Sequence, residues 1–406
     1  MGMMLAQKSL DEIFDDFLEN KRIFLDKQAL TQKYTPENIP HREKQIGEIA
    51  TILAPALRLE KPSNLFIYGK SGTGKTLTIT HVLNKLEEKA KQRDIPLKII
   101  YINCKLKRVA DTEYRLVAQL ARELGKEVPS TGLPTDEVYN IFYNAIEEKK
   151  QFVILVLDEI DHLVNKAGDE IMYNITRMNS SLKNSDLTFI GISNDLRFTE
   201  RLDARIKSSL GEEELIFSPY DALQLRDILQ HRGKKSFYDD VVDDLVINKC
   251  AAYAAREHGD ARRALDLLRV AGELAEREGL TNVNESHIDK AEDVMEKDRL
   301  TEAVTLLPKQ SQTLLYSIFN FTADFEGPAS TGDIYDIYKK LCTDIGLKQL
   351  TQRRVSDLLS ELDMLGIINA RVISQGRYGR TREIDISIPT DALNKISLIL
   401  KNELEI

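Results

Sequence analysis

The fold of this chain is decided by the stretch Leu65-Phe66-Ile67-Tyr68-Gly69-Lys70-Ser71-Gly72-Thr73-Gly74-Lys75-Thr76. Apolar residues typical of a buried strand run into the pattern Gly-x-x-x-x-Gly-Lys-Thr, and apolar residues at helical spacing follow from Leu77 to Lys91. The glycines let the backbone turn so that its N–H groups point at a polyphosphate, and the following helix adds its positive N-terminal end. The stretch therefore predicts a phosphate-binding loop rather than a structural glycine turn.

Two side chains of this loop carry its chemistry. Lys75 is expected to contact the β- and γ-phosphates of a bound nucleotide, and Thr76 to bind Mg²⁺. The loop thus predicts ATP or ADP and Mg²⁺ as cofactors. Its other nucleotide-binding candidates are Gly69, Lys70, Ser71, Gly72, Thr73, Gly74 and Leu77.

Length and composition predict a globular protein of two or three domains. The chain has 406 residues, of which 42% are hydrophobic and 30% charged, and no apolar run approaches membrane-spanning length. The N-terminus lacks a signal peptide, so we expect a cytoplasmic, nucleoid-associated protein without a membrane partner. Three widely spaced cysteines argue against disulfides and structural zinc. The net charge of −9 excludes a uniformly basic nucleic-acid coat but allows a local basic surface.

Strand and helix patterns alternate through the first half of the chain. Residues 1–40 form an expected arm that leads into a helix over 42–59. The alternation predicts a parallel sheet covered by helices on both faces, in an α/β nucleotide-binding domain over 41–218. The expected strands are 64–68, 97–103, 152–158, 187–193 and 214–217, and the expected helices are 74–92, 112–125, 136–149 and 169–183.

Helices take over after Pro219. Residues 219–304 are predicted to form a helical lid, with helices over 221–232, 239–257, 260–278 and 285–299. Residues 305–406 read as helices over 310–321, 331–344 and 352–365, strands over 367–374 and 382–388, and a terminal helix. Three helices followed by a β-hairpin predict a winged-helix domain, which is a helix-turn-helix variant.

The strand Phe152–Asp158 ends in two carboxylates. Asp158 is placed to hold Mg²⁺ or its water shell beside Thr76, and Glu159 to orient or deprotonate an attacking water. A strand that ends in acids is also common as the start of a solvated loop, but the phosphate loop upstream favours the catalytic interpretation.

Further polar residues are weaker candidates on their own. Asn194 follows the next strand and would point toward the γ-phosphate, or is a turn residue. Arg201 and Arg205 could reach a phosphate on an adjacent protomer, or lie on a surface helix. In the lid, Arg262 or its neighbour Arg263 could fold back to the phosphates.

Together with the loop, four further segments resemble the motifs of AAA+ ATPases. They are Leu157-Asp158-Glu159-Ile160-Asp161, Ser193-Asn194-Asp195, Arg205-Ile206-Lys207-Ser208-Ser209-Leu210 and Gly259-Asp260-Ala261-Arg262. The segment Ile39-Pro40-His41-Arg42-Glu43-Lys44-Gln45-Ile46 and the winged helix are similar to those of archaeal replication initiators related to the origin recognition complex and its cell-division-cycle partner. The resemblance runs from about Tyr34 to the C-terminus.

This resemblance implies roles for individual residues. Residues 69–76 would be Walker A, and Asp158 and Glu159 Walker B. Asn194 would be sensor 1, Arg262 sensor 2 and Arg205 the arginine finger, while Pro40, His41 and Arg42 would border the adenine pocket. The doubled arginines 262–263 leave open which side chain faces the phosphates, and Arg201 competes with Arg205.

The expected DNA contacts lie mainly in the winged helix. An apolar stripe of Val355, Leu358, Leu359, Leu362 and Leu365 leaves Gln352, Arg353, Arg354 and Ser356 toward the exposed start of a recognition helix. The wing tip offers Arg377, Tyr378 and Arg380, which suit phosphate or minor-groove contact. Residues 348–382 carry seven Lys or Arg against three Asp or Glu. Members of this family carry an inserted DNA-contacting segment in the ATPase domain. Residues Lys105–Pro134 occupy that place here, and Lys107 and Arg108 in it are basic.

The resemblance implies an ATP-dependent initiator that binds double-stranded origin DNA sequence-specifically and promotes loading of the replicative MCM helicase. Its further implied partners are paralogous initiators on adjacent DNA sites. A weak ATPase activity would serve as its switch. Two alternatives are a helicase or clamp loader with non-specific DNA contact, and a signalling ATPase whose winged helix binds protein.

Overall fold

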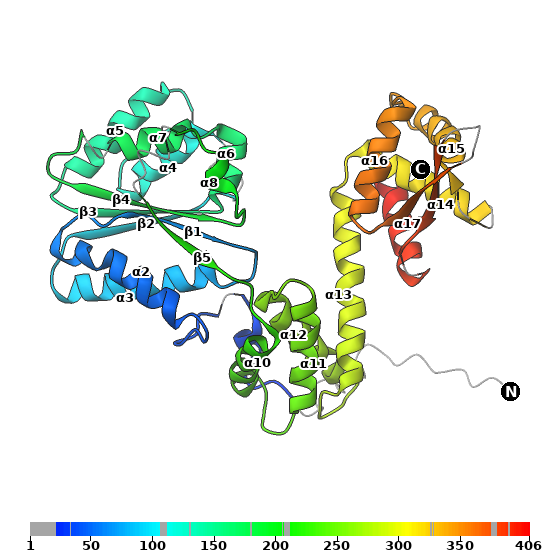
Figure 1. Ribbon diagram of the computed structural model, residues 1–406, viewed down its shortest axis with the longest axis horizontal. Helices are drawn as coiled ribbons and strands as arrows, with labels where there is room; N and C mark the ends of the chain where they lie inside the picture. The colour runs from blue at the N-terminus through cyan, green and yellow to red at the C-terminus, as the bar shows by residue number, and fades with distance from the viewer. Residues whose placement is uncertain are drawn as a thin grey trace. The chain divides into compact units, whose positions relative to one another are not determined.

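The computed structural model describes residues 22–406 apart from 33, 106–111, 130, 179–180, 205, 207–211, 325–326, 328, 375–379 and 389. The chain divides into two compact units, the first ending at Ile288 and the second spanning Asp289–Ile406. Helix α13, Glu285–Leu306, contains this boundary (Figure 1).

The first unit is built on a parallel sheet. Its five strands lie in the order β2-β3-β4-β1-β5, so the strand that leads into the phosphate loop lies between β4 and β5. Every neighbouring pair is parallel, which confirms the predicted sheet. The strands are β1 Asn64–Gly69, β2 Leu97–Asn103, β3 Phe152–Asp158, β4 Asp186–Ser193 and β5 Glu212–Phe217.

Helices cover both faces of the sheet. Figure 1 shows α2 and α3 on one face and α4 to α8 on the other. β1 and β3 are buried along their whole length because apolar clusters form on both sides of them. The helices are α2 Glu43–Leu53, α3 Lys75–Gln92, α4 Glu113–Glu123, α5 Thr135–Glu147, α6 Ile160–Ala167, α7 Glu170–Met178 and α8 Phe198–Arg201.

The first helix is shorter than the sequence pattern predicts. α2 ends at Leu53, and a 3-10 helix, η2 Ala54–Arg58, continues the turn. Pro55 lies in the first turn of η2, where the missing N–H of proline does not interrupt a hydrogen-bond ladder. The expected helix over 42–59 is therefore two elements.

The lid follows β5 and consists of α10 Ala222–Ser236, α11 Asp244–Arg256, α12 Ala261–Arg277 and the start of α13. An aspartate side chain caps the N-terminus of each of the first three helices. The short helix η1, Lys27–Leu30, belongs to the expected arm and packs against the lid. There the Phe24 and Phe237 rings stack with centroids 4.7 Å apart.

The second unit has the winged-helix arrangement that the sequence predicts. Antiparallel strands β7 and β8 form a hairpin, and the two-residue β6 pairs with β8. Among the described residues no helix is long and apolar enough to cross a membrane. The elements are α14 Lys309–Asp324, β6 Ala329–Ser330, α15 Thr331–Asp344, α16 Gln352–Met364, β7 Ile368–Ser374, β8 Arg380–Ile386 and α17 Thr390–Leu404.

Candidate nucleotide and DNA sites

The phosphate loop lies at the carboxyl ends of the parallel strands. β1 feeds the loop directly, and its neighbour β4 ends just before Asn194. β3 is the next strand and ends at Asp158. The sheet thus brings together residues that lie far apart in the sequence, at the edge where ligands of such folds bind.

The Lys75 amine is held inside the loop. Its Nζ donates hydrogen bonds to the carbonyls of Gly69 at 2.7 Å and Lys70 at 2.8 Å, and to Asn194 Oδ1 at 2.8 Å. Burial lowers the pKa of Lys75 to about 8, with a smaller lowering from the Arg262 charge and a partial offset from Asp158. An anion such as a phosphate would therefore stabilise the charged form of this amine.

Thr76 and Asp158 form a pair of candidate oxygen ligands for a metal ion at the phosphate loop. The Thr76 hydroxyl donates to Asp158 Oδ2 at 2.9 Å, while Asp158 Oδ1 accepts from the Glu159 backbone N–H at 2.9 Å. Asp158 is only 3% exposed. A hydroxyl keeps acceptor lone pairs when it donates, so this hydroxyl and carboxylate fit a hard cation such as Mg²⁺.

The backbone of the loop suits an anion. Gly72 and Gly74 have φ of +70° and +87°, a conformation that residues with a Cβ rarely adopt. Within the described part of the chain, the N–H groups of Gly72, Thr73 and Gly74 have no hydrogen-bond acceptor. A polyphosphate would supply the acceptors that these donors lack. Ser71 is exposed and Leu77 is half-buried in the first turn of α3.

Glu159 lies directly after β3 in a strained conformation. Its φ is +53°, and its Oε2 is buried with no hydrogen-bond partner among the described residues. Lys105 Nζ and His162 Nε2 each lie 3.7 Å from this oxygen. An acceptor oxygen without a donor next to the phosphate loop is suited to accept a proton from water.

The lid contacts the loop through the start of α12. The Ala261 N–H donates to the Gly72 carbonyl at 3.2 Å. The Asp260 carboxylate lies so close to Gly72 that a Cβ there would meet Asp260 Oδ1 at 1.8 Å. Asp260 also caps α12 by accepting from the backbone N–H groups of Arg262 and Arg263. The start of the lid helix α12 is thus in direct contact with the phosphate loop.

The two lid arginines have different surroundings. Arg263 forms an ion pair with Glu257, its NH2 donating to Glu257 Oε1 at 3.1 Å. Arg262 is exposed, and its charge is near enough to lower the pKa of Lys75. Arg263 is thus engaged within the lid, whereas Arg262 is exposed near Lys75.

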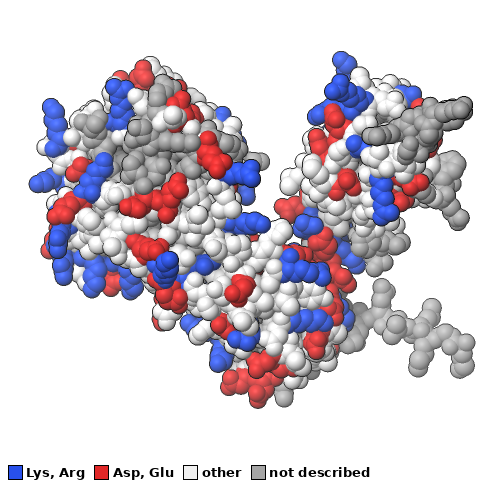
Figure 2. All heavy atoms as spheres, viewed as in Figure 1, with Lys and Arg blue, Asp and Glu red and all other residues white. Residues whose placement is uncertain are grey.

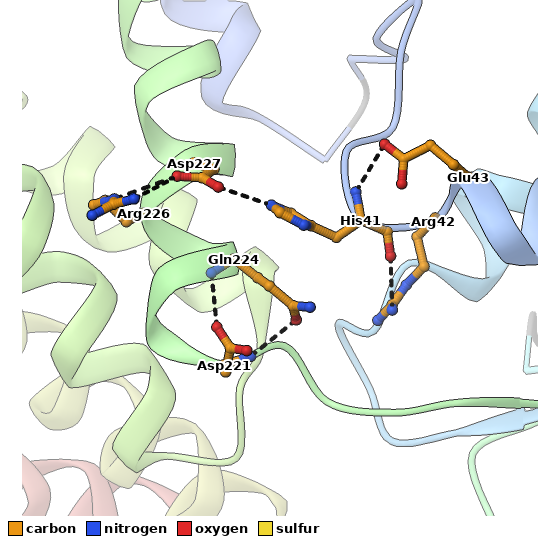
Figure 3. Close-up of polar contacts among 7 residues, drawn as sticks. All are labelled: His41, Arg42, Glu43, Asp221, Gln224, Arg226 and Asp227. Atoms are coloured by element: carbon orange, nitrogen blue, oxygen red, sulfur yellow. Dashed lines mark hydrogen bonds and ion pairs between the residues drawn. The ribbon is translucent and has the colours of Figure 1, made fainter.

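The segment Pro40-His41-Arg42 joins the sheet domain to the lid. His41 has φ of +63°, its backbone N–H donates to Glu43, and its Nε2 lies 3.1 Å from Asp227 Oδ2 on α10 (Figure 3). Asp227 is also hydrogen-bonded by Arg226, which is the main cause of its lowered pKa. Pro40 precedes this contact and is half-buried.

Arg42 is buried at the junction between loop and lid. It is 3% exposed, and its Nε donates to the Thr73 carbonyl at 2.9 Å and its NH2 to the Ser218 carbonyl at 2.7 Å. The guanidinium stacks on Tyr220, 3.9 Å from the ring centroid. Burial lowers the pKa of Arg42. One side chain thus connects the phosphate loop with the segment that enters the lid.

Several predicted site residues lie outside the described residues. They are Lys107, Arg108, Arg205, Arg377 and Tyr378. Arg201 ends α8 and Arg380 begins β8, but the side chains of these two arginines are not described. Their roles remain predictions from the sequence.

In the second unit, α16 exposes its first turn as predicted. Arg353 and Arg354 are exposed, and Arg354 forms a 3.6 Å ion pair with Asp357 in the same helix. Four residues of the predicted apolar stripe are buried, whereas Leu365 follows the helix and is 43% exposed. Figure 2 shows lysine and arginine side chains together at the end of this unit where Figure 1 places α15 and α16.

Arg382 serves the fold of the wing. Its NH1 donates to the Ser356 carbonyl at 3.1 Å and to Ser360 Oγ at 2.8 Å, both on α16. This arginine therefore ties β8 to α16, although the sequence groups it with the wing tip.

Two site residues escaped the sequence analysis. Tyr101 donates to Asp158, and Tyr220 lies under Arg42. Tyr101 has a signal in the sequence, because it alternates with the buried Ile100 and Ile102 and so shares a strand face with Asn103. Asp260 belongs to the quoted segment Gly259-Asp260-Ala261-Arg262, but its contact with Gly72 was not predicted.

Comparison with known proteins identifies the family. Residues 58–199 match the family described as "AAA domain", residues 226–293 the "Cdc6 AAA+ ATPase-type lid domain", and residues 302–396 the "CDC6, C terminal winged helix domain". An ORC1-type DNA replication protein of Thermococcus kodakarensis is 54% identical over 383 residues, which cover 93% of this chain and 92% of that protein. One from Pyrococcus furiosus is 52% identical and covers 96% of this chain and 93% of its own length.

A solved structure agrees with these relatives. The structure of the Aeropyrum pernix Orc1 protein in complex with DNA is similar with a TM-score of 0.81 and 45% identity, covering 94% of this chain and 98% of that chain. The findings confirm the predicted fold, an α/β AAA+ domain with a helical lid and a C-terminal winged helix. The chain belongs to the family of ORC1-type DNA replication proteins, which are origin-recognition AAA+ ATPases.

Proposed function

We propose that this protein is an ATP-dependent replication initiator that binds double-stranded origin DNA sequence-specifically and promotes loading of the replicative MCM helicase. The observation that carries the proposal is the contact of α12 with the phosphate loop, where Asp260 lies against Gly72. A ligand bound in this loop would lie next to the start of α12, so nucleotide would act as a conformational input to the lid.

The residues of the loop suit Mg²⁺–ATP. The backbone N–H groups of Gly72, Thr73 and Gly74 would surround the phosphates, and Lys75 would exchange its carbonyl partners for phosphate oxygens. Thr76 and Asp158 would hold Mg²⁺, which neutralises phosphate charge when it is bound. Pro40, His41 and Arg42 would border the adenine from the junction with the lid.

Hydrolysis in this site is expected to be slow. Glu159 would accept a proton from the attacking water, and Asn194 would bind the γ-phosphate. Arg262, on the lid helix α12, would contact the same phosphate. The arginine finger, Arg205, would act on the nucleotide of a neighbouring protomer. An isolated protomer then hydrolyses ATP weakly, and the reaction serves as a switch.

DNA binding belongs to the second unit in this proposal. The Aeropyrum pernix Orc1 structure was solved in complex with DNA. Here the exposed start of α16 offers Arg353 and Arg354 to the major groove. The wing tip, with Arg377, Tyr378 and Arg380, would contact phosphates or the minor groove, and Lys107 and Arg108 would add contacts from the first unit. Paralogous initiators would occupy adjacent sites.

Footprinting on genomic DNA beside the encoding gene tests the proposal. The protein should protect discrete sites, and the protection pattern should differ between ATP and ADP. Uniform protection along the DNA would support a non-specific helicase or clamp loader instead. Absence of duplex binding at low salt would contradict the proposal and favour a signalling switch.

A further inference from the structure

Tyr101 lies beside the two candidate magnesium ligands, Thr76 and Asp158, but belongs to none of the sequence motifs. It lies on β2, directly next to β3 in the sheet, where the register pairs Tyr101 with Val156 and Asn103 with Asp158. Residues two apart in a strand share a face, so Tyr101 and Asp158 are diagonal neighbours on one face of the sheet. An aromatic side chain is long enough to span such a diagonal.

The Tyr101 hydroxyl completes the hydrogen bonding of Asp158. It donates to Asp158 Oδ2 at 2.5 Å, the same oxygen that accepts from the Thr76 hydroxyl at 2.9 Å. Asp158 Oδ1 accepts from the Glu159 N–H. Three donors from three different segments therefore fix the plane of this carboxylate. Both oxygens of the carboxylate are thereby held in fixed positions next to the Thr76 hydroxyl.

Tyr101 contributes little to the hydrophobic core. The residue is 37% exposed, whereas Ile100 and Ile102 beside it are buried. Its hydroxyl is directed at Asp158 instead.

We propose that Tyr101 is a positioning residue for the magnesium site, orienting Asp158 so that its carboxylate and the Thr76 hydroxyl face the metal together. Partners that orient a metal-binding carboxylate typically change metal affinity by about 10–100-fold when removed. The inference rests on the proposed nucleotide site, because the metal accompanies the nucleotide.

The experiment is a magnesium titration of nucleotide binding with the full chain. Binding of a fluorescent ATP analogue is followed against Mg²⁺ concentration for wild type and Tyr101→Phe, and again in EDTA. Tyr101→Phe keeps the ring and removes only the hydroxyl. We expect the Mg²⁺ concentration at half-saturation to rise roughly tenfold or more, with unchanged affinity in EDTA.

Tyr139→Phe is the matched control. The Tyr139 hydroxyl also donates to a carboxylate, Glu113 Oε1 at 2.7 Å, but its partner is on α4 and outside the phosphate loop. Its magnesium dependence should equal that of wild type. Thermal melting of all three proteins reports whether they fold.

The outcomes separate the two proposals. Wild-type protein that binds no nucleotide at any Mg²⁺ concentration would contradict the proposed function. Wild-type protein with magnesium-dependent binding and a Tyr101→Phe variant with the same half-saturation would overturn only the role of Tyr101. An equal loss of affinity with and without magnesium would also overturn it, since it would point to a general effect on the nucleotide site.

Discussion

Lys75 Nζ donates a 2.8 Å hydrogen bond to Asn194 Oδ1, which joins the first residue of α3 to the residue that follows β4. Two further hydrogen bonds hold the amine to loop carbonyls. If a bound phosphate replaced Asn194 as the partner of this amine, the Asn194 NH₂ group would be able to donate to the γ-phosphate, as proposed above. Asn194 would then exchange its Lys75 partner for the nucleotide.

Asn194→Ala should therefore affect hydrolysis more than binding. We expect ATP affinity within a few-fold of wild type and single-turnover hydrolysis slower by at least about tenfold, because a donor to the developing charge is lost. Asn174→Ala is the control, since the Asn174 amide donates to Glu113 on α4. Equal hydrolysis rates for Asn194→Ala and wild type would remove Asn194 from the site.

The lowered pKa of Lys75 predicts how binding depends on pH. In the nucleotide-free protein burial lowers this pKa to about 8, and bound phosphate should raise it again because it favours the charged amine. The complex then holds a proton that the free protein loses above pH 8. ATP affinity should be level below pH 8 and fall by up to about tenfold per pH unit above it.

Calorimetry checks this directly. Titrations in two buffers with different ionisation enthalpies should show proton uptake on ATP binding at pH 9 and little at pH 7. An affinity that stays constant up to pH 9.5 would contradict the assignment of the titrating group to Lys75.

The two neighbouring lid arginines should differ in their effects. Arg262→Ala should weaken ATP binding by about 10–100-fold, the loss expected for a charge-assisted hydrogen bond, and leave the melting temperature unchanged. Arg263→Ala should keep ATP affinity but lower stability by about 1 kcal/mol, because the ion pair between Arg263 and Glu257 is lost. Nucleotide titrations and thermal melting of both variants distinguish them. Reversed effects would assign the nucleotide contact to Arg263.

The sequence was sufficient to predict most helices and strands and most of the phosphate loop. The strands around the phosphate loop are short apolar runs bounded by turns, and the glycines of the loop have a specific conformational role. Both features can be recognised from a few neighbouring residues in the sequence. α6, Ile160–Ala167, was not anticipated. It has eight residues and no side-chain cap, and it is stabilised by burial of Ile160 and Leu163, which is a tertiary effect.

Contacts between segments could not be read from the sequence. The hydrogen bond between Tyr101 and Asp158 depends on the register of β2 against β3. The choice between Arg262 and Arg263 depends on where Glu257 lies. Arg382 resembles the other wing arginines in the sequence but is bound to α16. Each of these cases is decided by three-dimensional neighbours rather than by residue type.

The exposed arginines at the start of α16 predict a specific change in salt dependence. Arg353→Ala combined with Arg354→Ala should lower affinity for duplex DNA. If both contact phosphates, the log–log slope against salt should fall by about 1.8, since each contact contributes about 0.9. Lys395→Ala with Lys401→Ala removes the same charge from exposed positions on α17 and should leave the slope nearly unchanged. Equal slopes for both double variants would show that Arg353 and Arg354 contact no phosphates.

The central claim is that nucleotide-bound protein selects particular duplex sequences. The most direct test is competition at fixed salt, in which a labelled duplex from a footprinted site is displaced by its own unlabelled sequence or by random duplex, in ATP and in ADP. The account predicts that random duplex competes at least about 1,000-fold less well and that the preference changes with the nucleotide. Equal competition by both duplexes in both nucleotides would contradict it.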